Sequence, residues 1–291
     1  MGSDFILFGG FDMKRLISLI ISFSLFLSSL IYIASAEQSQ INYLVLGDSI
    51  AYGSGLKNPE EASYGKIVAD TNGYEYKNHA VPGINSSELA EMIKTEEIIA
   101  DIRNADIISV SIGGNDFLGD NVSDLIFDAV LEEDLSVFDE TAEIFRSNLS
   151  FIINAITENN SDVIILLQTI YNPQSGKLKE LYQQGADRLN AVIYRCESEN
   201  PDRVCVVDIA AALDGNEENF AKDGIHPSVK GNELIASAVL KKLHSLGLCN
   251  STEIIITEKG KDIREPILRN FIIKILIKTV EFLVKLYNFA K

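Results

Sequence analysis

The chain has 291 residues, and 46% of them are hydrophobic, which is enough for one large domain or two small ones with a sizeable core. Acidic residues outnumber basic residues by 42 to 25, so the net charge is −17. This balance argues against nucleic acid as a partner, because phosphate binding needs positive charge, and we interpret the acidic surface as an aid to solubility.

The N-terminal segment has the pattern of an export signal. Residues 13–15 begin a short positive region, and an apolar run broken by serines and one tyrosine covers residues 16–33. Small residues at 34–36 then match the site at which signal peptides are cleaved. We therefore expect residues 1–36 to be a signal peptide with an upstream extension, and the protein to be exported, either secreted or held at the outer face of a membrane. An uncleaved N-terminal anchor is the alternative, because the apolar run is long for a signal peptide.

The middle of the chain alternates between strand and helix patterns. Apolar runs rich in β-branched residues predict four strands, at residues 43–46, 106–112, 163–169 and 203–208, and a weaker pattern predicts a fifth at residues 74–78. Helical periodicity predicts helices at residues 144–157, 179–197 and 228–246. Continuously apolar strands with helices between them predict a parallel sheet covered on both faces, in one doubly wound α/β domain.

Polar residues with useful chemistry follow four of the predicted strands. Ser49 follows the first strand, Gly83 the second, Asn115 the third, and Asp223 and His226 the fifth. Ligands of parallel sheets bind at the carboxyl ends of the strands, so we expect these residues to converge. Taken singly, several of them have an ordinary explanation: Ser49 as a helix cap, Asn115 as a turn residue, and Asp223 with His226 as a helix-capping loop that carries a surface histidine.

A serine hydroxyl becomes a good nucleophile when a neighbouring base takes its proton. The chain has three histidines. His244 is expected late in a helix, where a charge at the C-terminal end explains it, and His79 is expected to be structural or on the surface. His226 precedes Pro227 at a helix start, and Asp223 lies three residues earlier, close enough to hold the imidazole in one tautomer.

Acyl transfer also needs hydrogen-bond donors for the oxyanion that forms on the attacked carbonyl. A glycine allows its backbone N–H to approach a ligand closely, and an asparagine amide can donate at the same point. The candidates for this oxyanion hole are the backbone amides of Ser49 and Gly83 and the side chain of Asn115.

Four blocks of the chain together resemble the SGNH (GDSL) hydrolases, in the same order: Gly47-Asp48-Ser49, Gly83, Gly113-Gly114-Asn115-Asp116 and Asp223-x-x-His226. The resemblance covers roughly residues 41–247. It implies a three-layer α/β/α, flavodoxin-like fold with a five-stranded parallel sheet, and hydrolysis of acyl esters without a metal or an organic cofactor.

By position, the resemblance implies that Ser49 is the nucleophile, His226 the base and Asp223 the residue that orients His226. It places Gly83 and Asn115 with the Ser49 amide in the oxyanion hole. Pro82, which precedes the glycine of the second block, departs from the usual form of the family and leaves the orientation of the Gly83 amide open.

The motifs do not specify the ester that is hydrolysed. An exported enzyme with an apolar tail suggests lipid-like or short acyl esters, as for a lysophospholipase or lipase. A carbohydrate O-acetyl esterase is the main alternative, and a non-catalytic binding protein on the same fold is a remote one. The pocket beside Ser49 should decide, since a long apolar groove favours fatty acyl chains and a shallow polar one favours acetyl groups.

The C-terminal segment, residues 266–291, predicts a basic amphipathic helix with five basic residues and one acidic residue. It is expected either to contact a membrane surface, or to pack on an apolar face of the domain or on a second copy of the chain. Residues 250–265 would then link it to a hydrolase domain at residues 37–249.

Three cysteines remain to be explained, Cys196, Cys205 and Cys249. Export permits oxidation, and Cys196 and Cys205 lie at the end of a predicted helix and within the next strand, so a disulfide between them is an open possibility. No Cys-x-x-Cys spacing indicates a metal site.

Overall fold

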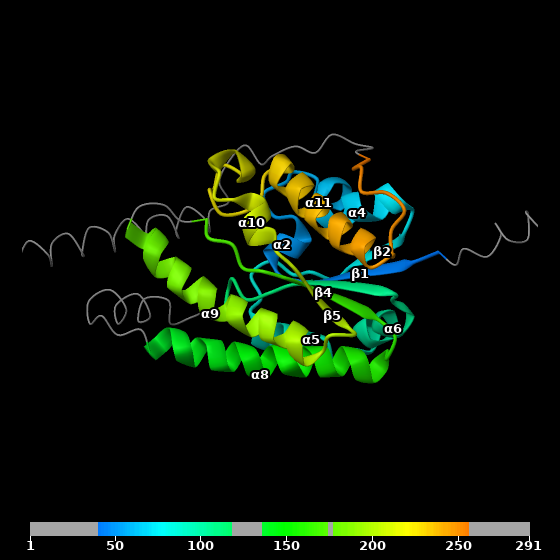
Figure 1. Ribbon diagram of the computed structural model, residues 1–291, viewed down its shortest axis with the longest axis horizontal. Coiled ribbons are helices and arrows are strands. Elements are labelled where there is room, and N and C mark those ends of the chain that lie inside the picture. Colours follow the sequence, from blue (N-terminus) through cyan, green and yellow to red (C-terminus); the bar gives the residue numbers. More distant parts are fainter. Residues whose placement is uncertain (1–39, 118–135, 174–176, 256–291) are drawn as a thin grey trace, which may run out of the picture. The chain divides into compact units, whose positions relative to one another are not determined.

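The computed structural model describes residues 40–117, 136–173 and 177–255, and they form a three-layer α/β/α arrangement (Figure 1). Five parallel strands make one sheet in the order β2-β1-β3-β4-β5. All five predicted strands are confirmed to within one residue at each end: β1 (Asn42–Gly47), β2 (Glu75–Asn78), β3 (Ile107–Ser111), β4 (Ile164–Gln168) and β5 (Val204–Val207).

Helices cover both faces of the sheet (Figure 1). One face carries α5 (Ser86–Met92), α6 (Glu96–Asn104), α8 (Ser136–Asn159) and α9 (Lys177–Glu199). The other carries α4 (Tyr64–Asn72), α10 (Ile209–Leu213) and α11 (Val229–Ser245). Three short helices, α2 (Ser49–Tyr52), α3 (Pro59–Ala62) and the 3₁₀ helix η1 (Glu217–Asn219), lie in connecting segments.

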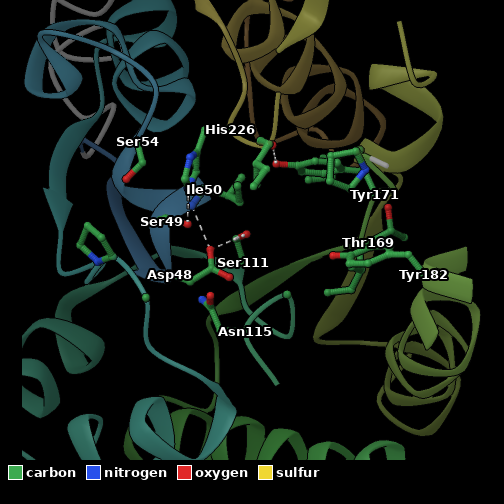
Figure 2. A pocket seen from close by; sticks show the side chains of 17 residues that line it. Asp48, Ser49, Ile50, Ser54, Ser111, Asn115, Thr169, Tyr171, Tyr182 and His226 are labelled. Atoms are coloured by element: carbon green, nitrogen blue, oxygen red, sulfur yellow. Dashed lines mark hydrogen bonds between the residues drawn. The ribbon is translucent and has the colours of Figure 1, made fainter. Parts of the chain in front are cut away.

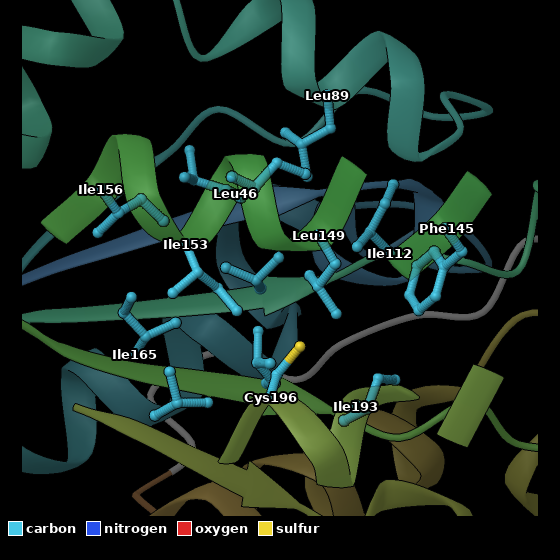
Figure 3. Packing of buried hydrophobic residues seen from close by; sticks show 14 of the residues in the cluster. Leu46, Leu89, Ile112, Phe145, Leu149, Ile153, Ile156, Ile165, Ile193 and Cys196 are labelled. Atoms are coloured by element: carbon cyan, nitrogen blue, oxygen red, sulfur yellow. The ribbon is translucent and has the colours of Figure 1, made fainter. Parts of the chain in front are cut away.

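Except for the edge strand β2, the strands are apolar on both sides because alternate side chains enter two different cores. In β1, Leu44 and Leu46 belong to the core under α8 and α9, whereas Tyr43 and Val45 belong to the core under α4 and α11. Figure 3 shows Leu46 packed in the first of these cores. The sheet is therefore buried on both faces, as the sequence predicts.

The longest helix, α8, begins earlier than its sequence pattern suggests. The prediction starts at residue 144, but the buried stripe already includes Phe138 and Ala142 and continues through Phe145 and Leu149. These positions are three or four residues apart, so they share one helical face turned toward the sheet. The predicted helix therefore exists and is about two turns longer at its start.

The strand order also fixes where a ligand can bind. From β1 the chain passes to β2 on one side, and β3 pairs with β1 on its other side. Connections that leave neighbouring strands in opposite directions open a crevice at the carboxyl ends, and here that point lies between β1 and β3. Ser49 and Asn115 follow these two strands.

The three cysteines are free thiols. Cys196 lies in the core beneath α8 and α9, whereas Cys205 packs against the core on the opposite face. The sheet separates the two sulfur atoms, so the possible disulfide between them does not form.

Several predictions lie outside the described residues, namely the signal peptide or anchor at 1–36, the helix at 266–291 and the end of the expected linker at 256–265. The start of that linker is attached to the domain, because the Asn72 side chain accepts hydrogen bonds from the backbone N–H groups of Asn250 (2.9 Å) and Ser251 (3.0 Å). Among the described helices, none combines the length and the apolar character that crossing a membrane requires.

Candidate active site

The turn after β1 brings the backbone of two strands into close contact. Gly47 has φ +130°, and a side chain there would place its Cβ 2.0 Å from the carbonyl oxygen of Ser111 at the end of β3. The backbone N–H of Asp48 donates to that same oxygen at 2.9 Å. Only glycine permits this approach, so Gly47 sets the direction in which the chain enters α2.

Asp48, and not Ser49, caps helix α2. An Asp48 Oδ1 atom accepts a hydrogen bond from the backbone N–H of Ile50 at 3.0 Å, which is the N-cap interaction. Ser49 is the first residue of the helix, and its hydroxyl is not needed for capping. The ordinary explanation of Ser49 as a capping residue therefore does not apply.

Ser49, His226 and Asp223 form a continuous hydrogen-bonded chain. His226 Nε2 lies 3.0 Å from Ser49 Oγ, and His226 Nδ1 lies 2.9 Å from Asp223 Oδ2. The other carboxylate oxygen of Asp223 accepts the backbone N–H groups of Ile225 (2.8 Å) and His226 (2.9 Å). Both oxygens of Asp223 are thus held in fixed directions, and the imidazole faces the serine.

The pKa of Asp223 follows from these contacts. Burial by itself would raise the pKa, but the hydrogen bond and charge of His226 and the two backbone N–H groups outweigh burial and lower it below the usual range. Asp223 therefore stays ionised and can stabilise a positive imidazole on His226.

The loop that carries His226 is fixed from two sides. The Tyr171 hydroxyl donates to the carbonyl of Ile225 at 2.7 Å. On the other side Gly55, at φ +105°, approaches so closely that an added Cβ would lie 2.8 Å from the Pro227 carbonyl and 3.0 Å from the Cβ of His226. These contacts restrict how far the imidazole can move away from Ser49.

The two other predicted donors lie on the same cleft as Ser49. Gly83 adopts φ +91°, a conformation that glycine readily takes, and Asn115 is oriented by its Nδ2 donating to the carbonyl of Ile84 at 2.9 Å. A side-chain amide has two N–H bonds, so Asn115 retains one for a ligand. The structure therefore brings together all five residues that the sequence predicts for the site.

Neighbouring side chains hold the two donor loops in place. Asp116 accepts hydrogen bonds from the backbone N–H (3.0 Å) and the hydroxyl of Ser86 at the start of α5. Asn78 accepts from the backbone N–H of Ala80 at 2.9 Å and donates to the carbonyl of Ala51 in α2 at 3.0 Å. The loop after β2 is thus tied to α2, and the loop after β3 is tied to α5.

The cleft has a volume of about 180 Å³. Figure 2 shows Ser49 between His226 and Asn115, with Thr169, Tyr171 and Tyr182 across the cleft. The wall across from Ser49 comes from the segment after β4 and from α9, and it includes Ile170, Tyr171, Pro173 and Tyr182. Ile209 of α10 and Ile225, beside His226, add further apolar lining.

The loop after β4 is absent from the sequence predictions, although β4 ends at the same edge of the sheet. The sequence could have indicated this loop as part of the site because it follows a predicted strand. Its apolar residues, however, match no catalytic pattern.

Asp48 is a second buried carboxyl group that the sequence predictions do not assign a role. Its side chain lines the cleft and the residue is only 2% exposed. Burial raises its pKa to about 7, and this effect outweighs the hydrogen bond from Ile50 and the positive charge of His226, which act in the opposite direction.

The other two histidines have structural positions. His79 Nε2 lies 2.7 Å from Asp101 Oδ2, and His244 lies in the last turn of α11. Within the part of the chain that the structure describes, no group of three or more histidine, cysteine, aspartate or glutamate residues is arranged to hold a metal ion.

Known proteins resemble this chain in sequence and in fold. The sequence profile of the GDSL-like lipase/acylhydrolase family matches residues 45–234. The chain is 27% identical over 218 residues to the spore germination lipase LipC of Bacillus licheniformis, covering 71% of this chain and 96% of LipC. It is 26% identical over 219 residues to the uncharacterized protein YpmR of Bacillus subtilis, covering 70% and 81% of the two chains.

Solved structures show the same architecture. The crystal structure of the lipase Lip_vut3 from a goat rumen metagenome superposes with a TM-score of 0.60 and 26% identity, covering 74% of this chain and all of the lipase.

Proposed function

The chain belongs to the GDSL-like lipase/acylhydrolase family of carboxylic ester hydrolases, and we propose that Ser49, His226 and Asp223 form its catalytic triad. The observation that carries this proposal is the hydrogen-bonded chain from Ser49 Oγ through both ring nitrogens of His226 to Asp223. A serine, a base and an orienting carboxylate in this arrangement are what nucleophilic acyl transfer needs.

In the first step, Ser49 Oγ attacks the ester carbonyl carbon while His226 Nε2 accepts the hydroxyl proton. The carbonyl oxygen becomes an oxyanion and accepts hydrogen bonds from the backbone N–H groups of Ser49 and Gly83 and from Asn115 Nδ2. When the tetrahedral intermediate collapses, the C–O bond to the alcohol breaks, His226 gives its proton to the alcohol oxygen, and an acyl-serine remains.

In the second step, a water molecule attacks the acyl-serine while His226 accepts a proton from the water. The second tetrahedral intermediate collapses, the proton returns to Ser49 Oγ, and the carboxylic acid leaves. Asp223 keeps the same imidazole tautomer throughout and stabilises the positive charge that His226 carries in both steps.

We propose that the substrate is a lipid-like or short acyl ester. The wall opposite Ser49 supports this choice, because Ile170, Tyr171 and Tyr182 offer apolar surface to a hydrocarbon group. The similarity to a spore germination lipase points in the same direction.

A covalent label tests the proposed nucleophile. A fluorophosphonate ester should react with the folded protein and add its phosphonyl group to one peptide, the one that contains Ser49, as mass spectrometry of a digest will reveal. The Ser49→Ala variant should not be labelled. Labelling at another serine, or equal labelling of Ser49→Ala, contradicts the proposal.

We also propose that the enzyme acts outside the cytoplasm, on the basis of the export pattern in residues 13–36. N-terminal sequencing of protein expressed in a bacterial host, after separation of medium, membranes and cytoplasm, tests this. Recovery of the uncleaved chain in the cytoplasm contradicts export.

A further inference from the structure

We propose that Tyr182 limits the acyl part of the substrate to short chains of about six carbon atoms or fewer; this inference rests on the proposed function of Ser49.

The direction of the acyl group follows from the geometry of the tetrahedral intermediate. Apart from Ser49 Oγ, the carbon carries an oxyanion, an alcohol oxygen and the acyl chain. The oxyanion faces Gly83 and Asn115, and the alcohol oxygen faces His226 Nε2, which must protonate it. The remaining direction leads to the wall across the cleft, where Figure 2 shows Tyr182.

The space behind Tyr182 is already filled. Its ring packs edge-on against Phe117, with ring centroids 6.4 Å apart, and Phe117 in turn packs edge-on against Phe138 at 5.6 Å. Phe117 is only 5% exposed, and it lies so close to Gly185 of α9 that an added Cβ would be 2.9 Å from its ring. Tyr182 therefore has no room to move backwards when a longer chain enters.

The neighbouring part of the wall is also held firmly. The side-chain amide of Asn190 accepts a hydrogen bond from the backbone N–H of Ile170 at 2.6 Å and donates to its carbonyl at 2.9 Å. The Tyr171 hydroxyl is engaged by the Ile225 carbonyl at 2.7 Å. The segment after β4 is thus fixed to α9 and to the loop of His226, so the wall keeps its shape.

The volume of the cleft sets the length of chain it can enclose. At about 180 Å³ it is close to an engineered apolar cavity of about 150 Å³ that binds benzene, a six-carbon molecule. The ester group itself takes part of this space. Carbons beyond about the sixth would lie outside the cleft and would gain no contact there.

The test measures kcat/KM for p-nitrophenyl esters from acetyl to dodecanoyl. For the wild-type enzyme we expect a maximum at butyryl or hexanoyl and a fall of about 10-fold or more by dodecanoyl. Tyr182→Ala should raise the ratio of dodecanoyl to butyryl turnover by about 10-fold or more, because it opens the end of the cleft. Tyr182→Phe should keep the wild-type profile.

Tyr194→Ala is the matched control, since Tyr194 lies on the same helix and is 46% exposed. It should leave the chain-length profile unchanged. Tyr182→Trp, which narrows the cleft without leaving a cavity, should move the maximum toward acetyl. This second variant keeps the inference testable if Tyr182→Ala does not fold.

The ester series distinguishes failure of the chain-length inference from failure of the proposed function. If Ser49-dependent turnover of dodecanoyl esters equals or exceeds that of butyryl esters, or if folded Tyr182 variants keep the wild-type profile, the inference about chain length is overturned while the proposed function stands. If no ester is hydrolysed in a Ser49-dependent manner, the proposed function itself is wrong.

Discussion

The Nε2 atom of His226 lies 3.0 Å from the Oγ atom of Ser49, although 177 positions separate the two residues in the sequence. This distance is within hydrogen-bond range and needs no rearrangement before proton transfer. Ser49 begins α2, just after β1, and His226 lies in the segment before α11, so the contact exists only because both segments reach the same edge of the sheet. The proposed mechanism depends on it, and the first predictions test it.

Removing the hydroxyl of Ser49 should abolish nearly all turnover. We expect Ser49→Ala to lower kcat for p-nitrophenyl butyrate on the order of 10⁴- to 10⁶-fold, because no nucleophile remains. Ser198→Ala, an exposed serine of α9, is the control and should keep full activity. Thermal melting should show that both variants are folded. Wild-type turnover by folded Ser49→Ala would refute the assignment.

Asp223→Asn should lower kcat on the order of 10⁴-fold while the protein stays folded. An amide cannot balance the positive charge on His226, and it favours the wrong imidazole tautomer by donating a hydrogen bond to Nδ1. Steady-state kinetics with the same ester measures the loss. A purely structural role for Asp223 predicts instead that activity and melting temperature fall together.

Asn115→Ala should lower kcat roughly 10²- to 10³-fold with little change in KM, because a donor to the oxyanion acts mainly in the transition state. Asn154→Ala, on the exposed face of α8, serves as the control. An Asn115→Ala effect confined to KM would show that the side chain binds the substrate but does not stabilise the oxyanion.

Asp48→Asn should alter how stability depends on pH. The pKa of Asp48 is about 7 in the folded protein and close to 4 when the chain is unfolded, so between these values the folded state holds a proton that the unfolded state has lost. The contribution of Asp48 to stability is therefore full below about pH 4 and is lost as the pH rises through about 7. An asparagine keeps the cap to Ile50 and does not ionise.

The free energy of unfolding of Asp48→Asn, relative to that of the wild type, should therefore increase by on the order of a few kcal/mol as the pH rises from about 4 to about 8. Urea unfolding at the two pH values measures this difference, and Asp202→Asn, at an exposed position, should show none. An equal effect of Asp48→Asn at both pH values would mean that folding does not raise the pKa of Asp48.

The cysteines should behave as three thiols. Under denaturing conditions without reductant, a thiol reagent should detect Cys196, Cys205 and Cys249 in full. In the native state Cys196 should react slowly, because burial raises the pKa of its thiol to about 11 and keeps it protonated. A reducing agent should leave the melting temperature unchanged. A deficit of two thiols would reveal a disulfide.

Local patterns in the sequence predicted much of the fold. Four of the five strands were predictable because runs of β-branched residues such as those around Val45 and Ile108 are buried on both faces, whereas the edge strand β2 is polar and half-exposed. A sequence of such runs separated by helices is compatible with few topologies. The positions of Ser49, Gly83 and Asn115 followed from the same pattern, since each lies in the segment that follows a strand. Asp223 and His226 also come after the last strand, but α10 and η1 separate them from β5. The early start of α8 and the free thiols did not follow, because packing decides both.

By itself, the sequence determined which side chains could perform the chemistry and that the ends of parallel strands would gather them at one edge. Only the tertiary structure decided that Asp48 takes the capping role, that Cys196 and Cys205 lie on opposite faces of the sheet, and that Tyr182 lines the cleft. The physical reason is that periodicity along the chain records which face of an element is buried, whereas the shape of a cleft depends on contacts between residues far apart in sequence. Tyr182 belongs to no sequence motif. The role that we propose for it depends on Phe117 and Phe138, which fill the space behind its ring.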